Sequence, residues 1–477
     1  MYNFRYKYPI ALGLFAGLVI IFQLILHQGT AVALAFAALP AILLGIGGII
    51  HKQYTFYAFF ILNYVIMGIN RYIPIKSGMI MTVLALGIIV ISMVKEIQTR
   101  QNWERSKNFL TFAWCIWLVY CILEIFNPSA LAAPWSIAIA NYAFFPLFCA
   151  ILVPVFFTRY KNFQWLLVIW ASLTLLAAFK GYWQRNQGFD TTELRWLFEE
   201  GGGSTHLINT GIRFFSFFSD AASYGASMGL SLIVFGISGF YARKKWLKIL
   251  FWLAALGGGY GLVISGTRSS LAIPFVGLAV YLVLCRNTKA IFTTAVLLIG
   301  SFVFLNYTTI GNSNRLIRRM RSAFDLNDAS FQIRQNNQQQ VYHLMKDKPF
   351  GIGLGLAGDK ADRFRPVNRH DPLTYMATDS WYVMTLVETG IAGLTLYLLI
   401  LLAILFKATY IASFRILNRE LQGQLYAIIA AISGILVTCY GNEVLNYPNG
   451  IIVYTLMAIL YIAPYYDREL NQHEANT

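Results

Sequence analysis

The chain has 477 residues, of which 57% are hydrophobic and only 12% are charged, with 37 Lys and Arg against 21 Asp and Glu. Soluble globular proteins carry roughly a quarter of their residues as charged side chains. The composition therefore excludes a soluble globular protein and predicts that most of the surface faces lipid.

Long apolar runs recur along the whole chain. Runs near twenty residues match the ~30 Å hydrocarbon core of a bilayer, and each must be helical because the core offers its backbone no water. We therefore predict an all-α integral membrane protein, a polytopic bundle of about 12–14 transmembrane helices. The first run is expected to be a retained helix rather than a signal peptide, since no small-residue cleavage site follows Leu26. The expected spans are 9–27, 31–50, 54–70, 77–94, 109–126, 137–157, 163–180, 221–241, 249–265, 269–285, 290–306, 381–406, 424–440 and 449–464.

The connections between these spans alternate in charge. One set is short and basic, so the positive-inside rule places it, together with both chain ends, in the cytoplasm. The other set contains short connections of almost no charge and two long loops, 181–220 and 307–380, which are expected outside. These loops separate N-terminal helices (1–180), central helices (221–306) and C-terminal helices with a short cytoplasmic tail (381–477). The basic set contains Arg5, Lys7, Lys52, Lys95, Arg100, Arg105, Lys107, Arg159, Lys161, Arg243, Lys244, Lys245, Lys248, Arg286, Lys289, Lys407, Arg415 and Arg419.

The longer loop, 307–380, has an unusual charge for an outer loop. It carries eleven Lys and Arg against seven Asp. These charges fit a solvated surface or contact with anionic lipid headgroups. They also fit a site for a polyanionic substrate, because guanidinium groups bind phosphate oxygens in a bidentate way.

Two arginines outside this loop stand near the ends of spans. Arg213 lies in GIRFFSFFSDAASYG (211–225), where Asp220 either caps the following helix or has a chemical role. Arg268 lies in the turn SGTRSS (265–270), where the alternatives are a snorkelling interfacial arginine and a functional one.

Two further motifs surround the end of the long loop. Residues 334–358 read RQNNQQQVYHLMKDKPFGIGLGLAG, which predicts a helix broken at Pro349 and then a glycine-rich turn. Residues 377–394 read ATDSWYVMTLVETGIAGL and open a long span. There Glu388 is expected to face the protein interior, and Gly390 and Gly393 to allow close helix packing.

These motifs occur in the order seen in a known family. Residues 205–410 resemble the superfamily of O-antigen ligases and polysaccharide polymerases. The shared features are an Arg ahead of a helix (Arg213), a GTRS turn (Arg268), a large loop with Arg334, D-x-P-F-G-x-G (347–353), and a helix ending in E-T-G-I-x-G (388–393).

The resemblance implies a metal-independent, inverting glycosyltransferase of the GT-C type, without a cofactor. Such enzymes move a glycan from undecaprenyl pyrophosphate to an acceptor at the outer face of the bacterial inner membrane. Ligases use lipid A–core in lipopolysaccharide biosynthesis, and polymerases use another lipid-linked glycan. We prefer the ligase-like interpretation, with the polymerase as the alternative. The expected partners are the donor, the acceptor and membrane lipids, with no nucleic acid, and Arg213, Arg334 and Arg268 are expected to bind the pyrophosphate.

The chain departs from the family at the acceptor side of the site. Asp379-Ser380 stands where the family has a His-Asn pair. A carboxylate serves as general base when partial desolvation raises its pKa. Asp379 is therefore one candidate base, and His370, nine residues upstream, is the second.

Two other classes of protein stay open at this point. A transporter of lipid-linked oligosaccharides fits the number of helices, but the two halves show no inverted or parallel repeat. A non-catalytic subunit of a polysaccharide export machine would depend on no single arginine.

Overall fold

The computed structural model describes residues 52–99, 103–208, 211–285, 287–324, 329–358, 361, 364, 372–376 and 378–475. The first two expected spans, 9–27 and 31–50, lie outside the described residues.

The described chain is almost entirely helical, and each expected span from residue 54 onward coincides with a helical segment. Within the described ranges, nine helical stretches are long and apolar enough to cross a membrane. An all-α polytopic membrane protein is thereby confirmed. The long segments are α3 (Lys52–Tyr72), α4 (Ser77–Thr99), α5 (Phe109–Leu123) with η2 (Glu124–Phe126), α6 (Ala132–Ile139) with η3 (Ala140–Phe144) and α7 (Phe145–Phe156), α8 (Tyr160–Asn186), α11 (Ala221–Tyr241), α12 (Lys245–Ile264), η4 (Ser269–Leu271) with α13 (Ala272–Leu284), α14 (Thr288–Tyr307), α18 (Trp381–Phe414), α19 (Arg419–Thr438) and α20 (Asn449–Ala475).

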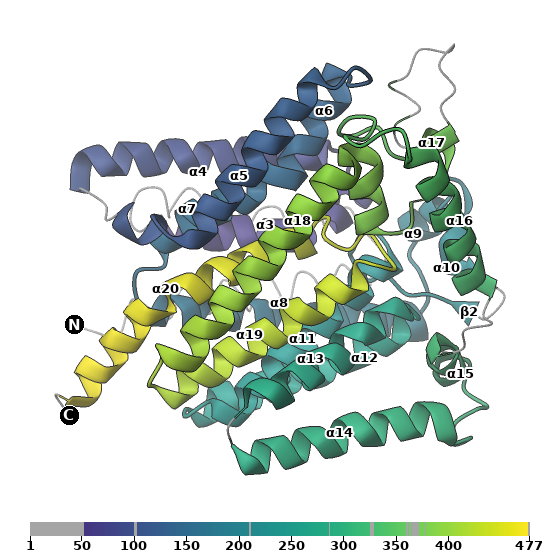
Figure 1. The fold of residues 1–477 in the computed structure, drawn as a ribbon. Coiled ribbons are helices and arrows are strands. Elements are labelled where there is room, and N and C mark those ends of the chain that lie inside the picture. Colours follow the sequence, from purple (N-terminus) through teal and green to yellow (C-terminus); the bar gives the residue numbers. More distant parts are fainter. Residues whose placement is uncertain are drawn as a thin grey trace.

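The short elements gather mainly at one end of the bundle, which we call the loop end. Figure 1 shows them on the right-hand side, opposite the C-terminal end of α20. Apart from η1 (Trp103–Ser106), they come from the two long loops expected from the sequence. They are α9 (Thr191–Phe198), α10 (Gly203–His206), the antiparallel strands β1 (Leu207–Ile208) and β2 (Gly211–Ile212), α15 (Arg315–Arg321), η5 (Ser322–Phe324), α16 (Ala329–Met345) and α17 (Pro372–Tyr375).

Three helices form the centre of the bundle. The most apolar windows of α11, α19 and α20 are 83%, 83% and 89% buried. Glycine allows the close approach that drives helix packing in lipid. A Cβ on Gly258 of α12 would lie 2.7 Å from the Met228 carbonyl oxygen of α11, and one on Gly434 of α19 would lie 2.6 Å from the Ile273 carbonyl oxygen of α13.

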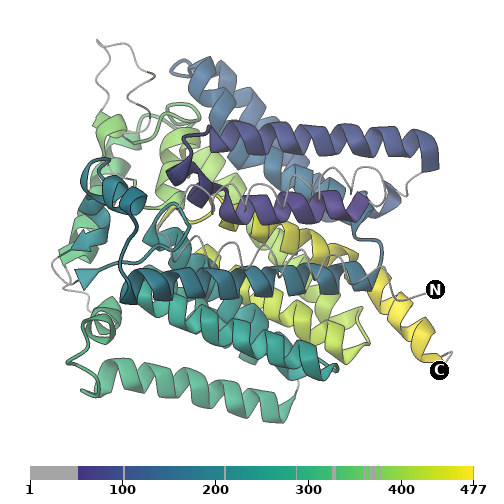
Figure 2. The same ribbon diagram turned by 180° about the vertical axis from the view of Figure 1, so that it is seen from behind.

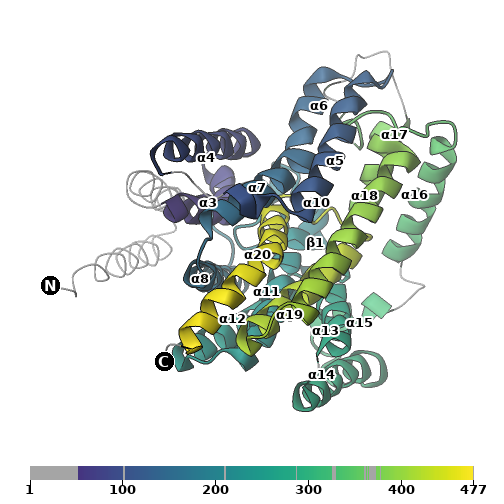
Figure 3. The ribbon, with the colours of Figure 1, turned by 60° about the vertical axis from the view of Figure 1, so that its left-hand side comes forward.

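The outer helices pack more loosely. Seen from behind, α3, α4 and α8 cover one face of the bundle (Figure 2). On another side, α14 runs along the periphery (Figure 3), and only 6% of its most apolar window is buried. Most of α14 is thus left to face lipid.

Helix α18 is interrupted where the glycine-rich turn of the long loop enters it. Gly390 has φ 69° and ψ −177°, which is not helical. The amides of Ile352 and Gly353 donate to the carbonyl oxygens of Val387 and Glu388 (2.9 and 3.1 Å). The loop therefore satisfies carbonyl groups that the break in the helix leaves free. The expectation for Gly390 was incomplete, since it breaks the helix as well as allowing close packing.

Two glycines make this junction possible. A Cβ on Gly351 (φ 76°) would lie 2.6 Å from the Glu388 carbonyl oxygen, and one on Gly390 would lie 2.0 Å from the Pro349 carbonyl oxygen. The Glu388 side chain is buried as expected, and its Oε1 accepts a hydrogen bond from the Ala357 amide (3.3 Å). The motifs around Pro349 and Glu388 are thus two halves of one structural joint.

We expect Gly390→Ala to destabilise the protein by at least about 1–3 kcal/mol, because the backbone region of Gly390 is essentially restricted to glycine and its Cβ would meet the Pro349 carbonyl. Thermal unfolding in detergent measures the effect. Gly300→Ala in α14 is the matched control, since nothing lies within 4 Å of a Cβ there. Equal melting temperatures for the two variants would contradict the role of the joint.

Candidate functional site

The arginines expected to bind phosphate converge at the loop end. Arg213 follows β2, Arg268 lies between α12 and α13, and Arg334 belongs to α16. Burial lowers the pKa of the Arg213 guanidinium; the Asp220 carboxylate opposes this effect, and the charges of Arg334 and Arg268 add to it. The three guanidinium groups therefore lie close enough to repel one another.

Arg213 is fixed in place by neutral oxygen atoms. Its Nη2 donates to the Thr267 hydroxyl (2.8 Å), and its Nη1 donates to the Thr205 carbonyl oxygen (3.0 Å). The same Thr267 hydroxyl donates to the Ala221 carbonyl oxygen (2.9 Å). Arg213 is thus joined to the first turn of α11 and to the GTRS turn without losing its charge to a carboxylate.

Asp220 is the N-cap of α11, which was one of the two roles expected from the sequence. Its Oδ1 accepts hydrogen bonds from the amides of Ala222 and Ser223, both at 2.8 Å. Its Oδ2 accepts from the hydroxyls of Ser219 and Ser223 (2.7 and 2.9 Å). With both oxygens occupied, Asp220 supports the site through its charge and its cap.

His206 holds the strand that carries Arg213. Its Nε2 accepts from the Ala221 amide (3.0 Å), its Nδ1 lies 2.8 Å from the Gly202 carbonyl oxygen, and its own carbonyl oxygen accepts from the Arg213 amide (2.9 Å). The first two contacts together require a neutral ring protonated at Nδ1. The residue has no free nitrogen for proton transfer.

The GTRS turn brings a fourth arginine to the site. Gly266 has φ 59°, and a Cβ there would lie 3.2 Å from Arg319 Nε and 3.4 Å from Arg213 Cγ. Arg319 Nε donates to the Gly266 carbonyl oxygen (2.5 Å). The sequence grouped Arg319 with surface arginines of the long loop, but the structure places it at this turn. Its neighbour Arg318 on α15 is exposed.

Arg268 connects the same turn to the end of α15. Its Nη1 donates to the Ser322 hydroxyl (2.9 Å), and Ser322 in turn donates to the Arg319 carbonyl oxygen (2.9 Å). These hydrogen bonds hold Arg268 of the GTRS turn and Arg319 of α15 in fixed positions relative to each other.

Arg334 reaches the site from α16. Its Nη1 would lie 3.7 Å from a Cβ on Gly441, in the connection between α19 and α20. One helical turn further along α16, Gln338 Oε1 accepts a hydrogen bond from the Tyr440 hydroxyl (2.9 Å). Two residues on one face of α16 thus lie against the same short connection.

The connection of residues 439–448, which we call the hub loop, joins the parts of the site. Asn442 Nδ2 donates to the Ser269 hydroxyl, and the Thr438 hydroxyl just before the loop donates to the Ser269 carbonyl oxygen (3.3 Å). The Thr378 hydroxyl donates to Glu443 Oε1. The sequence treated this loop as a short, nearly uncharged connection and gave it no function, because it contains no motif and a single acidic residue.

Of the two candidate bases, the structure describes Asp379 but not His370. Asp379 is exposed and has φ 44°, unusual for a residue other than glycine, and it lies beside Thr378 of the Glu443 hydrogen bond. His370 lies outside the described residues. Within the ranges that the structure describes, no three His, Cys, Asp or Glu side chains gather as metal ligands would.

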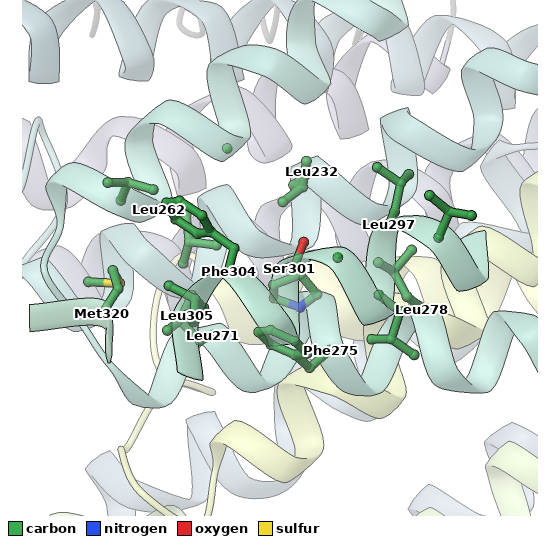
Figure 4. A pocket seen from close by; sticks show the side chains of 16 residues that line it. Leu232, Leu262, Leu271, Phe275, Leu278, Leu297, Ser301, Phe304, Leu305 and Met320 are labelled. Carbon is green, nitrogen blue, oxygen red and sulfur yellow. The ribbon is translucent and has the colours of Figure 1, made fainter. Parts of the chain in front are cut away.

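An apolar pocket, which we call the groove, lies among the membrane-spanning helices. It has a volume of about 480 Å³ and is lined by residues of α11, α12, α13 and α14, with Met320 of α15 at one end. Figure 4 shows Leu262, Leu271 and Met320 near one end and Leu278 and Leu297 near the other. Met320 is the residue after Arg319, and Leu271 lies three residues after Arg268. One end of the pocket is therefore lined by residues close in sequence to two of the arginines.

The fold and the site together define a polytopic α-helical membrane protein with a cationic site and an apolar groove. A family model described as O-antigen ligase matches residues 249–398, which include Arg268, Arg319 and Arg334. The chain is also similar to an O-antigen polymerase of Salmonella muenchen, with 25% identity over 398 residues, covering 76% of this chain and 92% of that relative. Both matches support the superfamily of O-antigen ligases and polymerases that the sequence motifs resemble.

The environment of His206 makes the stability of the protein depend on pH. Burial lowers the pKa of His206 to about 4, and the charge of Arg213 adds to this effect. An unfolded histidine has a pKa near 6.5, so the unfolded chain binds this proton first as the pH falls. The free energy of unfolding must then decrease between about pH 6.5 and pH 4, by up to about 3 kcal/mol.

We expect His206→Gln to melt with a weaker pH dependence than the wild type between pH 7 and pH 4.5. Glutamine supplies one donor and one acceptor but no titrating group. Thermal unfolding at a series of pH values measures this difference, and His343→Gln, at an exposed position of α16, is the control. The same pH slope in the wild type and in His206→Gln would contradict a buried neutral imidazole.

Proposed function

We propose that this protein transfers a glycan from undecaprenyl pyrophosphate to an acceptor at the outer face of the bacterial inner membrane. The proposal is carried by one observation: Arg213, Arg268 and Arg319 meet at the GTRS turn, and Leu271 and Met320, close to Arg268 and Arg319 in the sequence, line an apolar pocket. A polyprenyl pyrophosphate has an apolar chain and a polyanionic head, so it matches both parts of this arrangement.

The chemistry of transfer explains why several arginines are needed. As the bond from the sugar to the pyrophosphate breaks, negative charge develops on the leaving group. Fixed cations that are already in place stabilise this charge without further rearrangement. In this proposal the enzyme is an inverting, metal-independent transferase of the GT-C type, and Asp379 and His370 remain candidates for the base.

The orientation in the membrane follows from the basic connections. Arg159, Lys161, Arg243 and Arg415 lie at the ends of their helices opposite the loop end. If these residues are cytoplasmic, as the positive-inside rule favours, the site faces the periplasm.

The acceptor distinguishes a ligase from a polymerase. The description of the matching family favours lipid A–core, the acceptor of a ligase. The name of the Salmonella relative, which this chain matches over 92% of the relative's length, favours another lipid-linked glycan. Both reactions require the pyrophosphate to be bound in the same way, so the arginines do not distinguish a ligase from a polymerase.

Deletion of the gene in its host, followed by gel analysis of surface and lipid-linked glycans, separates the possibilities. A ligase is expected to leave long polymer on undecaprenyl pyrophosphate and none on lipid A–core. A polymerase is expected to leave single repeat units at the surface and no ladder. An unchanged glycan pattern would contradict the proposed function.

We expect Arg213→Ala and Arg334→Ala to reduce glycan transfer by at least about 100-fold, since removal of one stabilising group costs 10²–10³ in rate at comparable sites. Restoration of the glycan pattern in the deletion strain measures this, with membrane insertion checked in parallel. Arg318→Ala, at an exposed position of the same long loop, is the control and should restore the pattern. Normal glycan from both Arg213→Ala and Arg334→Ala would contradict the phosphate grip.

A further inference from the structure

The hub loop places a carboxylate beside the phosphate-binding arginines. Glu443 follows Gly441 by two residues, and Arg334 Nη1 would lie 3.7 Å from a Cβ on Gly441. Two residues of chain span at most about 7 Å. With the Cα–Cβ bond added, the Glu443 backbone lies within about 12 Å of the Arg334 guanidinium.

The structure holds this carboxylate in one orientation. The Thr378 hydroxyl donates to Glu443 Oε1, and Asn446 Nδ2 donates to the Glu443 carbonyl oxygen (3.2 Å). The buried residues Val444 and Leu445 anchor the chain on the other side.

The other titratable groups nearby are less suited to this task. Asp379 is exposed, although it adjoins Thr378. Glu388 is only 3% exposed and lies under the turn that ends at Ala357. Tyr142 is buried, and His206 has both ring nitrogens engaged.

We propose that Glu443 is the base that activates the acceptor, an inference that rests on the proposed function. The acceptor hydroxyl oxygen forms a bond to the anomeric carbon of the donor sugar, and the bond from that carbon to the pyrophosphate oxygen breaks. The hydroxyl proton passes to the Glu443 carboxylate and then to water. Undecaprenyl pyrophosphate leaves with the bonding electron pair, held by the arginines.

The experiment separates binding of the leaving group from transfer. Envelopes of the deletion strain carrying each variant, with the endogenous lipid-linked glycan as donor, are assayed for glycan transfer between pH 5.5 and pH 8.5. Binding of undecaprenyl pyrophosphate is measured on each purified variant. The set is Glu443→Gln, Glu443→Asp and Asp379→Asn, with Glu199→Gln, at an exposed carboxylate of the first long loop, as the control.

Glu443→Gln should lose about 100-fold or more in rate, as expected for loss of a general base, and still bind undecaprenyl pyrophosphate like the wild type. Its residual rate should no longer fall at acid pH, whereas Glu443→Asp should keep that fall. Glu199→Gln should stay within about threefold of the wild type, and Asp379→Asn should lose less activity than Glu443→Gln.

A second pair of variants tests the same assignment without altering Glu443. Thr378→Val removes the hydroxyl that orients the Glu443 carboxylate, so the rate of transfer should fall while undecaprenyl pyrophosphate still binds. Thr378→Ser keeps a hydroxyl and should restore the wild-type rate. A wild-type rate in Thr378→Val would overturn the assignment.

The outcomes distinguish this inference from the proposed function. An active wild type with an active Glu443→Gln, or with an inactive Asp379→Asn in its place, would overturn only the role of Glu443. Loss of undecaprenyl pyrophosphate binding in Glu443→Gln would assign the residue to structure and overturn its role as the base. A wild type that neither binds undecaprenyl pyrophosphate nor restores the glycan pattern would overturn both.

Discussion

Like charges repel, and the architecture of the loop end follows from holding four guanidinium groups together against this repulsion. The protein does so with neutral acceptors. Arg213 donates to Thr205 and Thr267, Arg319 donates to the Gly266 carbonyl oxygen, and Arg268 donates to the Ser322 hydroxyl. These neutral acceptors fix the positions of the guanidinium groups. The loop end is therefore rich in positive charge, which is the property on which the proposed binding of a pyrophosphate rests.

The core of the bundle supplies the rigidity that this arrangement requires. The hub loop connects α19 and α20, whose apolar windows are among the most buried of the described helices. Ser269 of η4, Gln338 of α16 and Ser380 at the start of α18 all form hydrogen bonds with this loop. Because repelling groups separate unless their supports are stiff, a loop mounted on central helices is a better anchor than one on the loosely packed α14.

The sequence predicted those features of the protein that a single segment of the chain determines. Apolar runs identified the helices, because a membrane permits few other structures. Arg213, Arg268 and Arg334 were recognised from motifs that resemble the family, with the cost of an arginine at the membrane edge as a second reason for Arg268, and the structure brings all three to the loop end. The roles of the three, like that of Asp379, stay proposals.

The sequence did not reveal features that depend on pairs of distant segments. Arg319 looked like its exposed neighbour Arg318, and only the fold shows that it faces the Gly266 turn. Glu443 lies 64 residues after Asp379 and 109 residues after Arg334 in the sequence, with no local motif around it. The break at Gly390 was likewise hidden, since a glycine in an apolar run usually indicates close packing, and the partner that requires the break is the loop at Pro349.

The joint between that loop and α18 also limits how the family can change. Gly351 and Gly390 each leave room for the backbone of the other segment, so no side chain at one position is compensated by a change at the other. The two positions are then expected to be inherited together as glycine, because a side chain at either one would meet the backbone of the other segment.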